Sequence, residues 1–206
     1  MCSLASREKQ LLLEVARRAL TCAVQRQDLP GTFPTDEALN RSAGAFVTLR
    51  RPGGRLRGCI GQFPSGEPLV RVVACCAKAS ALEDPRFEPV RPEELAELDI
   101  ELSVLSPIEE IAADKIEIGK HGLVVSSGGC RGVLLPQVAV EHRWTAQRLL
   151  EETCIKTGLD ADAWKRPETL IEGFTAEVFS ESDFRPEKAG AAGSAPGSSP
   201  GYSSST

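Results

Sequence analysis

The sequence predicts an α+β protein in which a mainly antiparallel sheet is flanked by helices. Glycine-rich turns at residues 52–54 and 127–130 each join two short strand-like segments, as the turns of antiparallel hairpins do. Helical segments lie between these hairpins without the regular strand and helix alternation of a doubly wound parallel sheet. The 206 residues, 41% apolar and 26% charged, suffice for one sizeable core.

The first third of the chain predicts a helix, a loop and a hairpin. Residues 6–27 repeat apolar side chains at helical spacing. Residues 29–34 contain two prolines and a glycine, which interrupt regular structure, and a short helix over 36–41 can follow. Residues 44–51 and 55–60 flank the Pro-Gly-Gly turn, so we expect them to be the two arms of the first hairpin.

The middle of the chain predicts a buried helix and a half-buried strand. Residues 67–82 are apolar on nearly every face, which is typical of a helix inside a protein. The helix is expected to end before Asp84, which precedes a proline. A short helix over 92–98 and a strand over 98–105 follow, and the state of residues 108–118 stays open.

The last structured segments predict a second hairpin, a helix and a strand. Residues 123–126 and 132–135 flank the second glycine-rich turn. Residues 145–157 form a helical pattern that Gly158 can end, and residues 169–180 carry strand formers.

The C-terminal end differs in composition from the rest of the chain. From about residue 186 onward Gly, Ala, Ser and Pro predominate, and such a segment cannot bury enough apolar area to order itself. We therefore expect a single domain over residues 1–185 and a disordered tail over residues 186–206.

Charge and cysteine content argue against several classes of protein. The net charge of −5 is unlike that of a protein that holds nucleic acid or an anionic membrane by bulk electrostatics. No apolar run reaches the ~18 residues of a membrane span. Seven cysteines without a CxxC pair, and only two histidines, match neither a zinc site nor a secreted disulfide framework. We expect reduced thiols, a cytoplasmic location, no metal and no cofactor.

The main candidate site is the stretch Leu-Arg-Gly-Cys-Ile-Gly at residues 56–61. Gly58 and Gly61 lie inside a predicted strand, where glycine loses packing and backbone entropy, so they indicate a bend or a close approach. Cys59 follows Arg57 closely, and nearby positive charge makes a thiolate more available as a nucleophile. The alternative is a buried strand cysteine, since cysteine is among the most buried residue types.

Other polar residues offer weaker candidates. His121, in a glycine-flanked loop, is the better of the two histidines to act as a base for Cys59, and the alternative is a loop histidine without a role. Asp84 and Arg86 can orient a ligand or pair with each other. The arginines around the first turn can hold a phosphate or carboxylate, or form a solvated hairpin tip; they are Arg50, Arg51, Arg55 and Arg57.

Five segments of the chain resemble the AMMECR domain family, whose relatives include the AmmeMemoRadiSam system protein A. Residues 56–61 resemble the family's signature hexapeptide, and residues 81–87 its D-x-RF segment. The other three resemblances are to the "isvLs" strand, the G-x-HG loop and the LPqV segment: residues 101–105, 119–123, and 135–138 with Glu141 and Trp144. The resemblance covers roughly residues 8–180.

The resemblance implies an α+β fold of two unequal lobes with a cleft between them, the larger lobe built from both ends of the chain. Prokaryotic relatives are often encoded with a Memo-like protein and a radical-SAM protein, which are the implied partners. No biochemical activity is established for the family. The matching segments make Cys59 and His121 candidate catalytic residues, and the candidate ligand-binding residues are Arg57, Gly58, Gly61, Asp84, Arg86 and Gln137.

Three functions are compatible with these residues. The favoured one is a binding or adaptor module in which Arg57 and the glycines hold a ligand or a partner such as the Memo-like protein, with Cys59 packed inward. The second is a thiol-dependent enzyme that uses Cys59 on a small anionic substrate. The third, RNA or DNA binding, has the turn arginines in its favour and the acidic charge and few aromatic residues against it.

Overall fold

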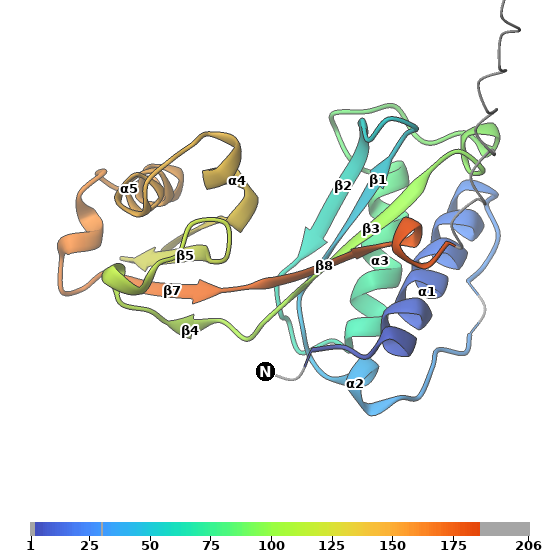
Figure 1. The fold of residues 1–206 in the computed structure, drawn as a ribbon, viewed down its shortest axis with the longest axis horizontal. Coiled ribbons are helices and arrows are strands. Elements are labelled where there is room, and N and C mark those ends of the chain that lie inside the picture. The colour runs from blue at the N-terminus through green and yellow to red at the C-terminus, as the bar shows by residue number, and fades with distance from the viewer. Residues whose placement is uncertain (1–2, 30, 186–206) are drawn as a thin grey trace, which may run out of the picture.

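The protein is described by a computed structural model that places residues 3–29 and 31–185. The tail predicted over residues 186–206 lies outside the described residues. Within them, two four-stranded antiparallel sheets are flanked by helices, so the predicted α+β class is confirmed. Figure 1 shows the two sheets side by side, joined by chain segments that run from one into the other. No described helix is long and apolar enough to cross a membrane.

The larger sheet has the strand order β2-β1-β3-β8 and is antiparallel throughout. Its strands are β1 Ala45–Arg50, β2 Leu56–Gln62, β3 Asp99–Leu105 and β8 Ala176–Ser180. Helices α1 (Ser6–Val24) and α3 (Leu69–Leu82) pack on one face, and the short α2 is Glu37–Asn40. The part of the molecule built on this sheet therefore contains both the first helix and the last strand.

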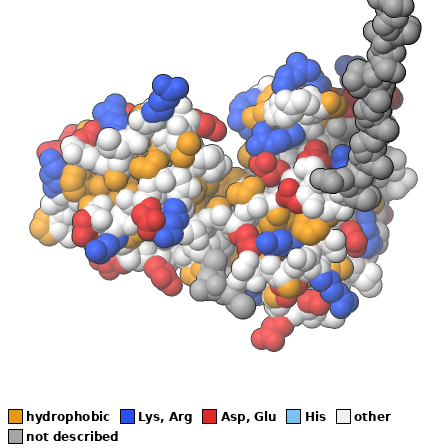
Figure 2. Space-filling view, viewed as in Figure 1, with side chains coloured by type: hydrophobic (Ala, Val, Ile, Leu, Met, Phe, Trp, Pro, Cys, Tyr) orange, Lys and Arg blue, Asp and Glu red, His pale blue; other side chains and the backbone are white. Residues whose placement is uncertain are grey.

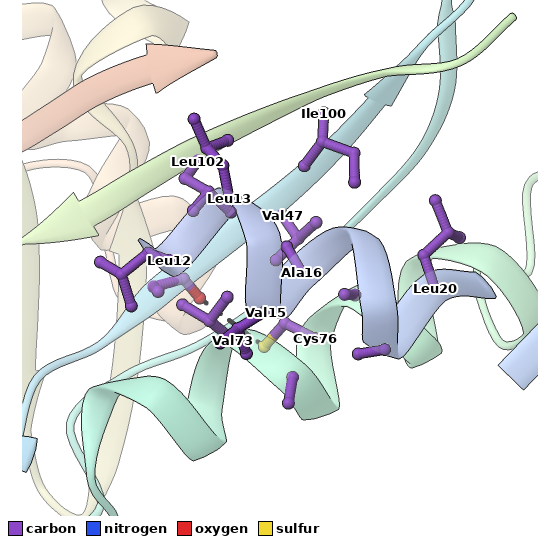
Figure 3. Close-up of a cluster of buried hydrophobic side chains, with 14 of the residues drawn as sticks. Leu12, Leu13, Val15, Ala16, Leu20, Val47, Val73, Cys76, Ile100 and Leu102 are labelled. Atoms are coloured by element: carbon purple, nitrogen blue, oxygen red, sulfur yellow. Dashed lines mark hydrogen bonds between the residues drawn. The ribbon is translucent and has the colours of Figure 1, made fainter. Parts of the chain in front are cut away.

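The core of this part lies between the helices and one face of the sheet. Figure 3 shows Leu12, Ala16 and Leu20 of α1 beside Val73 and Cys76 of α3. The strands contribute the alternate side chains that point toward these helices, all of them fully buried: Val47, Leu49, Ile100 and Leu102. The strict alternation of β3 explains why its sequence pattern predicted a half-buried strand.

The smaller sheet has the strand order β4-β7-β5-β6. Its strands are β4 Glu109–Glu110, β5 Gly122–Ser127, β6 Cys130–Leu134 and β7 Leu170–Phe174. Helix α5 (Ala146–Thr157) covers one face, and α4 is Pro136–Glu141. The buried residues beneath α5 form cores separate from the one under α1 and α3, which is the arrangement that two lobes would have.

The chain crosses between the sheets twice, and the two crossings are tied together. The Ser106 amide donates to the Thr175 carbonyl and the Thr175 amide donates to the Ser106 hydroxyl, both at 2.9 Å. The single strand predicted over residues 169–180 is wrong, because Thr175 separates β7 from β8 and each strand joins a different sheet. Next to this crossing, Phe63 packs edge-on between Phe46 and Phe174.

The remaining segments are short. The undecided region 108–118 contains β4 and a single 3-10 turn, Ala113–Lys115, and the helix expected over 92–98 is a 3-10 turn at Pro92–Glu94. The Pro-Gly-Gly turn is confirmed, since Gly53 and Gly54 have φ values of 81° and 78°. These left-handed conformations explain two adjacent glycines at this turn.

Candidate functional site

Cys59 lies in the middle of β2, on the face of the larger sheet that points away from α1 and α3. We call this face the open face and define it by six side chains: Phe46, Thr48, Arg50, Cys59, Glu101 and Ser103. The residues between them point to the helices, because successive side chains of a strand alternate. Cys59 is half-buried there, so it is not a core cysteine.

Hydrogen bonds fix the side chains around Cys59. The Thr48 hydroxyl donates to the Cys59 sulfur at 3.3 Å, directly across the strand pair. Two residues along β1, the Arg50 guanidinium donates to both carboxylate oxygens of Glu101, at 3.1 and 2.9 Å. This bond to Glu101 is the main reason that the pKa of Arg50 is raised. The open face therefore carries a half-buried thiol, the buried Thr48 hydroxyl beneath it and a partly exposed ion pair.

Asp84 and Arg86 lock the free edge of β2 at Cys59. The Cys59 amide donates to Asp84 Oδ2 at 2.8 Å, and its carbonyl accepts from Arg86 Nη2 at 3.2 Å. The Arg86 guanidinium also donates to both Asp84 oxygens, at 2.9 and 2.7 Å. This hydrogen bond from Arg86 is the largest reason that the pKa of the buried Asp84 lies well below its usual range. The Asp84–Arg86 pair thus satisfies the Cys59 backbone groups that a neighbouring strand would otherwise bind.

Arg57 points away from solvent and is held by Glu94. Its Nε and Nη2 donate to the two Glu94 oxygens at 2.8 and 2.9 Å, and only 6% of its side chain is exposed. Arg51 donates to the same carboxylate at 2.7 Å. The bond from Arg57 is the main cause that lowers the pKa of Glu94 to about 2. Three of the four turn arginines are therefore neutralised by carboxylates within the protein.

Both glycines of the hexapeptide are required by close packing, as the sequence predicted. A Cβ on Gly58 would lie 2.1 Å from the backbone oxygen of Ser80 in α3. A Cβ on Gly61 would lie 2.0 Å from the Phe46 ring. The space that each glycine leaves is thus filled by the protein itself. A direct ligand role for Gly58 and Gly61 stays a prediction, and their packing does not require one.

His121 and Gln137 belong to the smaller sheet. The Glu117 amide donates to His121 Nδ1 at 3.0 Å, so this nitrogen is an acceptor within its own loop. Gln137 is exposed on α4, whose Val140 packs against the same loop at Gly119. Among residues 3–29 and 31–185, no hydrogen bond joins His121 to Cys59, and the recorded side-chain partner of the Cys59 thiol is Thr48.

The end of α4 approaches the open face. The negative charge of Glu141 contributes to the raised pKa of Arg50, although less than the Glu101 carboxylate that Arg50 contacts. Figure 1 places α4 on the side of the smaller sheet that faces β1 and β2, and Figure 2 shows a notch between these parts. The charge of Glu141 at the end of α4 is thus felt by Arg50, 91 residues earlier in the sequence.

A metal site does not form among these residues. Within the described part of the chain, no group of three or more His, Cys, Asp and Glu side chains is placed to hold an ion. The chemistry that the site offers is therefore hydrogen bonding, ion pairing and the Cys59 thiol.

A family model described as AMMECR1 matches residues 13–179, which is most of the chain. The chain belongs to the AMMECR1 family. This confirms the resemblance that the five motif segments indicated.

Its AMMECR1 relatives are archaeal and bacterial proteins. A protein of Thermococcus gammatolerans is 44% identical over 184 residues, which cover 84% of this chain and 89% of the relative. A protein of Aquifex aeolicus is 37% identical over 179 residues, covering 84% and 92%. The crystal structure of an uncharacterised protein from Pyrococcus horikoshii is similar, with a TM-score of 0.71 and 42% identity over 82% of this chain and 89% of that one.

The AMMECR1 motifs meet around β2 only in part. The structure brings Arg57, Gly58, Cys59, Asp84 and Arg86 together, and it places His121 in the loop before β5 and Gln137 on α4, beside the smaller sheet. Sequence reasoning missed Thr48 and the pairing of Arg50 with Glu101 on the open face, and it missed Glu94, which holds Arg57 from the turn Pro92–Glu94. Strand alternation was the available signal for Thr48 and Arg50, because they share a face of β1. Nothing in the sequence indicated that Glu94 pairs with Arg57.

Proposed function

We propose that this AMMECR1-family chain is a cytoplasmic binding module that holds a ligand or a protein partner on the open face, opposite α4. The observation that carries the proposal is the partly exposed Arg50–Glu101 pair, fixed on the same sheet face as the half-buried Cys59 thiol. Surfaces whose polar groups are already fixed suit recognition, because little conformational entropy is lost when a partner binds.

The geometry favours binding over catalysis by Cys59. A catalytic thiol is activated by a base or by nearby positive charge, and here the thiol contacts the Thr48 hydroxyl while Arg50 and Arg86 are paired with carboxylates. The charged groups of Asp84, Arg86 and Arg57 form hydrogen bonds within the protein. In this proposal these residues therefore act by fixing β2. The partly exposed Arg50–Glu101 ion pair then supplies the polar groups at the surface, and Gln137 supplies an amide from α4.

The proposed protein partner is the Memo-like protein, with the radical-SAM protein acting in the same pathway. Support comes from family membership together with a surface whose polar groups are already ordered. Ordered charges at an interface contribute most to partner choice and to the rate of encounter.

The test is equilibrium binding of the purified chain to a Memo-like protein from the same organism, measured by calorimetry. We expect Arg50→Gln to weaken binding by about tenfold or more, as the loss of a charged hydrogen-bond group at an interface does. The matched control is Arg148→Gln, which removes an arginine from an exposed ion pair on α5 and is expected to leave binding unchanged. Equal binding by wild type and Arg50→Gln would rule out the open face as the binding surface.

A thiol-dependent enzyme is the second proposal, because Cys59 is half-buried on the open face and not in the core. Competitive alkylation over pH 5 to 9 tests it, with exposed Cys130 as the internal reference. Alkylation of Cys59 faster than Cys130, with loss of pathway function in Cys59→Ser, would favour the enzyme. Slow alkylation and full function in Cys59→Ser would leave the binding module.

A further inference from the structure

A second cavity lies along α3, away from the open face. Its volume is about 460 Å³, within the range of small-molecule sites. It is bordered by the loop after α1, by the end of β2 and by one side of α3: Leu29, Phe33, Gln62, Glu67, Arg71, Val72, Ala74, Cys75 and Lys78. None of the segments that match the family motifs contributes to this cavity, and the proposed function leaves it without a role.

The floor of this cavity is apolar. Val72 and Ala74 belong to the buried side of α3, and Leu29 and Phe33 pack against the main core. Gln62 contributes a polar group at the end of β2, and its amide donates to the Ser65 hydroxyl at 2.5 Å. A ligand there would place an apolar body against a surface that belongs to the rigid core.

The rim of the cavity carries two cations without a carboxylate partner. Arg71 and Lys78 are exposed, and in the described part of the chain neither lies within 4.0 Å of a carboxylate oxygen. The Arg71 guanidinium lies 5.9 Å from the centre of the Phe33 ring, so the cation stays over the cavity wall. Glu67 is the one acidic side chain among the lining residues. This contrasts with Arg50, Arg51 and Arg57, which all have acidic partners.

We propose that this cavity binds an amphipathic anion, namely a small carboxylate with an aliphatic or aromatic body. The positive charges of Arg71 and Lys78 favour an anion, and the apolar floor favours one with an apolar body. The carboxylate would lie between Arg71 and Lys78, whose long side chains start about two helical turns apart on one side of α3, and the body would cover Val72, Ala74 and Phe33. This site is separate from the proposed function, so either can fail without the other.

Cys75 makes the proposal measurable in the native chain. Its exposed thiol lines the cavity between the two cations, whereas the exposed thiol of Cys130 lies in the other sheet. An occupant should shield Cys75 from N-ethylmaleimide and leave Cys130 unaffected. Octanoate is the probe, and octylammonium, with the same body and the opposite charge, is the control. Alkylation of each cysteine is followed by peptide mass spectrometry.

We expect saturating octanoate to slow alkylation of Cys75 at least about fivefold, with no change at Cys130 and no protection by octylammonium. Arg71→Gln/Lys78→Gln should raise the Kd for octanoate about tenfold or more, because both charged donors are removed. Arg148→Gln/Lys156→Gln makes the same charge change on α5 and should protect as wild type does.

Three results would overturn the proposal: no protection by octanoate, equal protection by octylammonium, or unchanged protection in Arg71→Gln/Lys78→Gln. A fourth would reassign the cavity. If an acidic peptide with an apolar side chain protects Cys75 and octanoate does not, the cavity receives a protein partner and not a small anion.

Discussion

Two carboxylates, Asp84 and Glu94, hold the hexapeptide strand at Cys59 and at Arg57. Asp84 accepts the Cys59 amide, and Glu94 holds Arg57 from the other end of the stretch. The sequence predicted that Asp84 either orients a ligand or pairs with Arg86, and the structure shows the pair. Glu94 was not predicted, because 37 residues separate it from Arg57 and charge alone does not select one acid among many.

Glu94→Gln should lower the free energy of unfolding by about 2 to 3 kcal/mol, since it leaves the buried Arg57 without a charged partner. Urea unfolding at pH 7 measures the change. Glu151→Gln, which affects an exposed ion pair on α5, is the control and should change stability little. A loss in Glu94→Gln no larger than in the control would contradict the role of the pair.

The same carboxylates predict how stability depends on pH. The folded pKa values of Glu94 and Asp84 are both lowered, Glu94 to about 2, so the unfolded chain binds more protons than the folded chain as pH falls through 4. Their contribution is complete above the unfolded pKa values and is lost as pH falls toward the folded ones. We expect wild type to lose about 2 kcal/mol from Glu94 between pH 5 and 2. Glu94→Gln should show a shallower dependence in urea unfolding at each pH, and an equal slope would contradict the assignment.

The two glycines of the hexapeptide should respond differently to alanine. In Gly58→Ala the new methyl group meets the Ser80 backbone of α3, which cannot move aside, so we expect a loss of about 3 kcal/mol or failure to fold. In Gly61→Ala it meets the Phe46 side chain, so Phe46→Leu should recover part of the loss. Thermal unfolding of the single and double variants measures this. The packing would be contradicted if Phe46→Leu restored the stability of Gly58→Ala. It would also be contradicted if Phe46→Leu restored none of the stability that Gly61→Ala loses.

Among the secondary-structure elements, the connection between the sheets matters most for the notch. Phe63 packs edge-on between Phe46 of the larger sheet and Phe174 of the smaller one. Gly61 and Gly122 make room for the outer two rings, since a Cβ at Gly122 would lie 2.4 Å from Phe174. Two glycines from different family motifs thus serve one aromatic contact between the sheets.

Phe63→Ala should therefore weaken the connection between the sheets. We expect a loss of about 2 to 3 kcal/mol, below the value for a fully buried ring because Phe63 is half-buried. Hydrogen exchange should also become faster around Ser106 and Thr175, where the chain crosses between sheets. Phe87→Ala, another half-buried ring outside this contact, is the control. Unchanged exchange at the crossing in Phe63→Ala would show that the rings do not join the sheets.

Individual elements were largely predictable from local patterns, and their assembly was not. The periodicity of β3 and α1 and the two glycine turns identified the hairpins and helices correctly. The prediction of a single strand over residues 169–180 was wrong, because strand-forming residues occur on both sides of Thr175. Nothing in their pattern indicates that the two halves join different sheets. The pairing of Arg57 with Glu94 and the influence of Glu141 on Arg50 are likewise long-range interactions without a local signal.

At the scale of the whole molecule, the open face is the proposed binding surface. Hydrogen exchange of the chain with and without the Memo-like protein tests this claim most directly, because it reports protection along the whole described chain without a mutation. We predict slower exchange in β1, β2 and α4, with α5 unchanged. Binding that protects α5 or the outer side of α1, and leaves β1, β2 and α4 unchanged, would contradict the account.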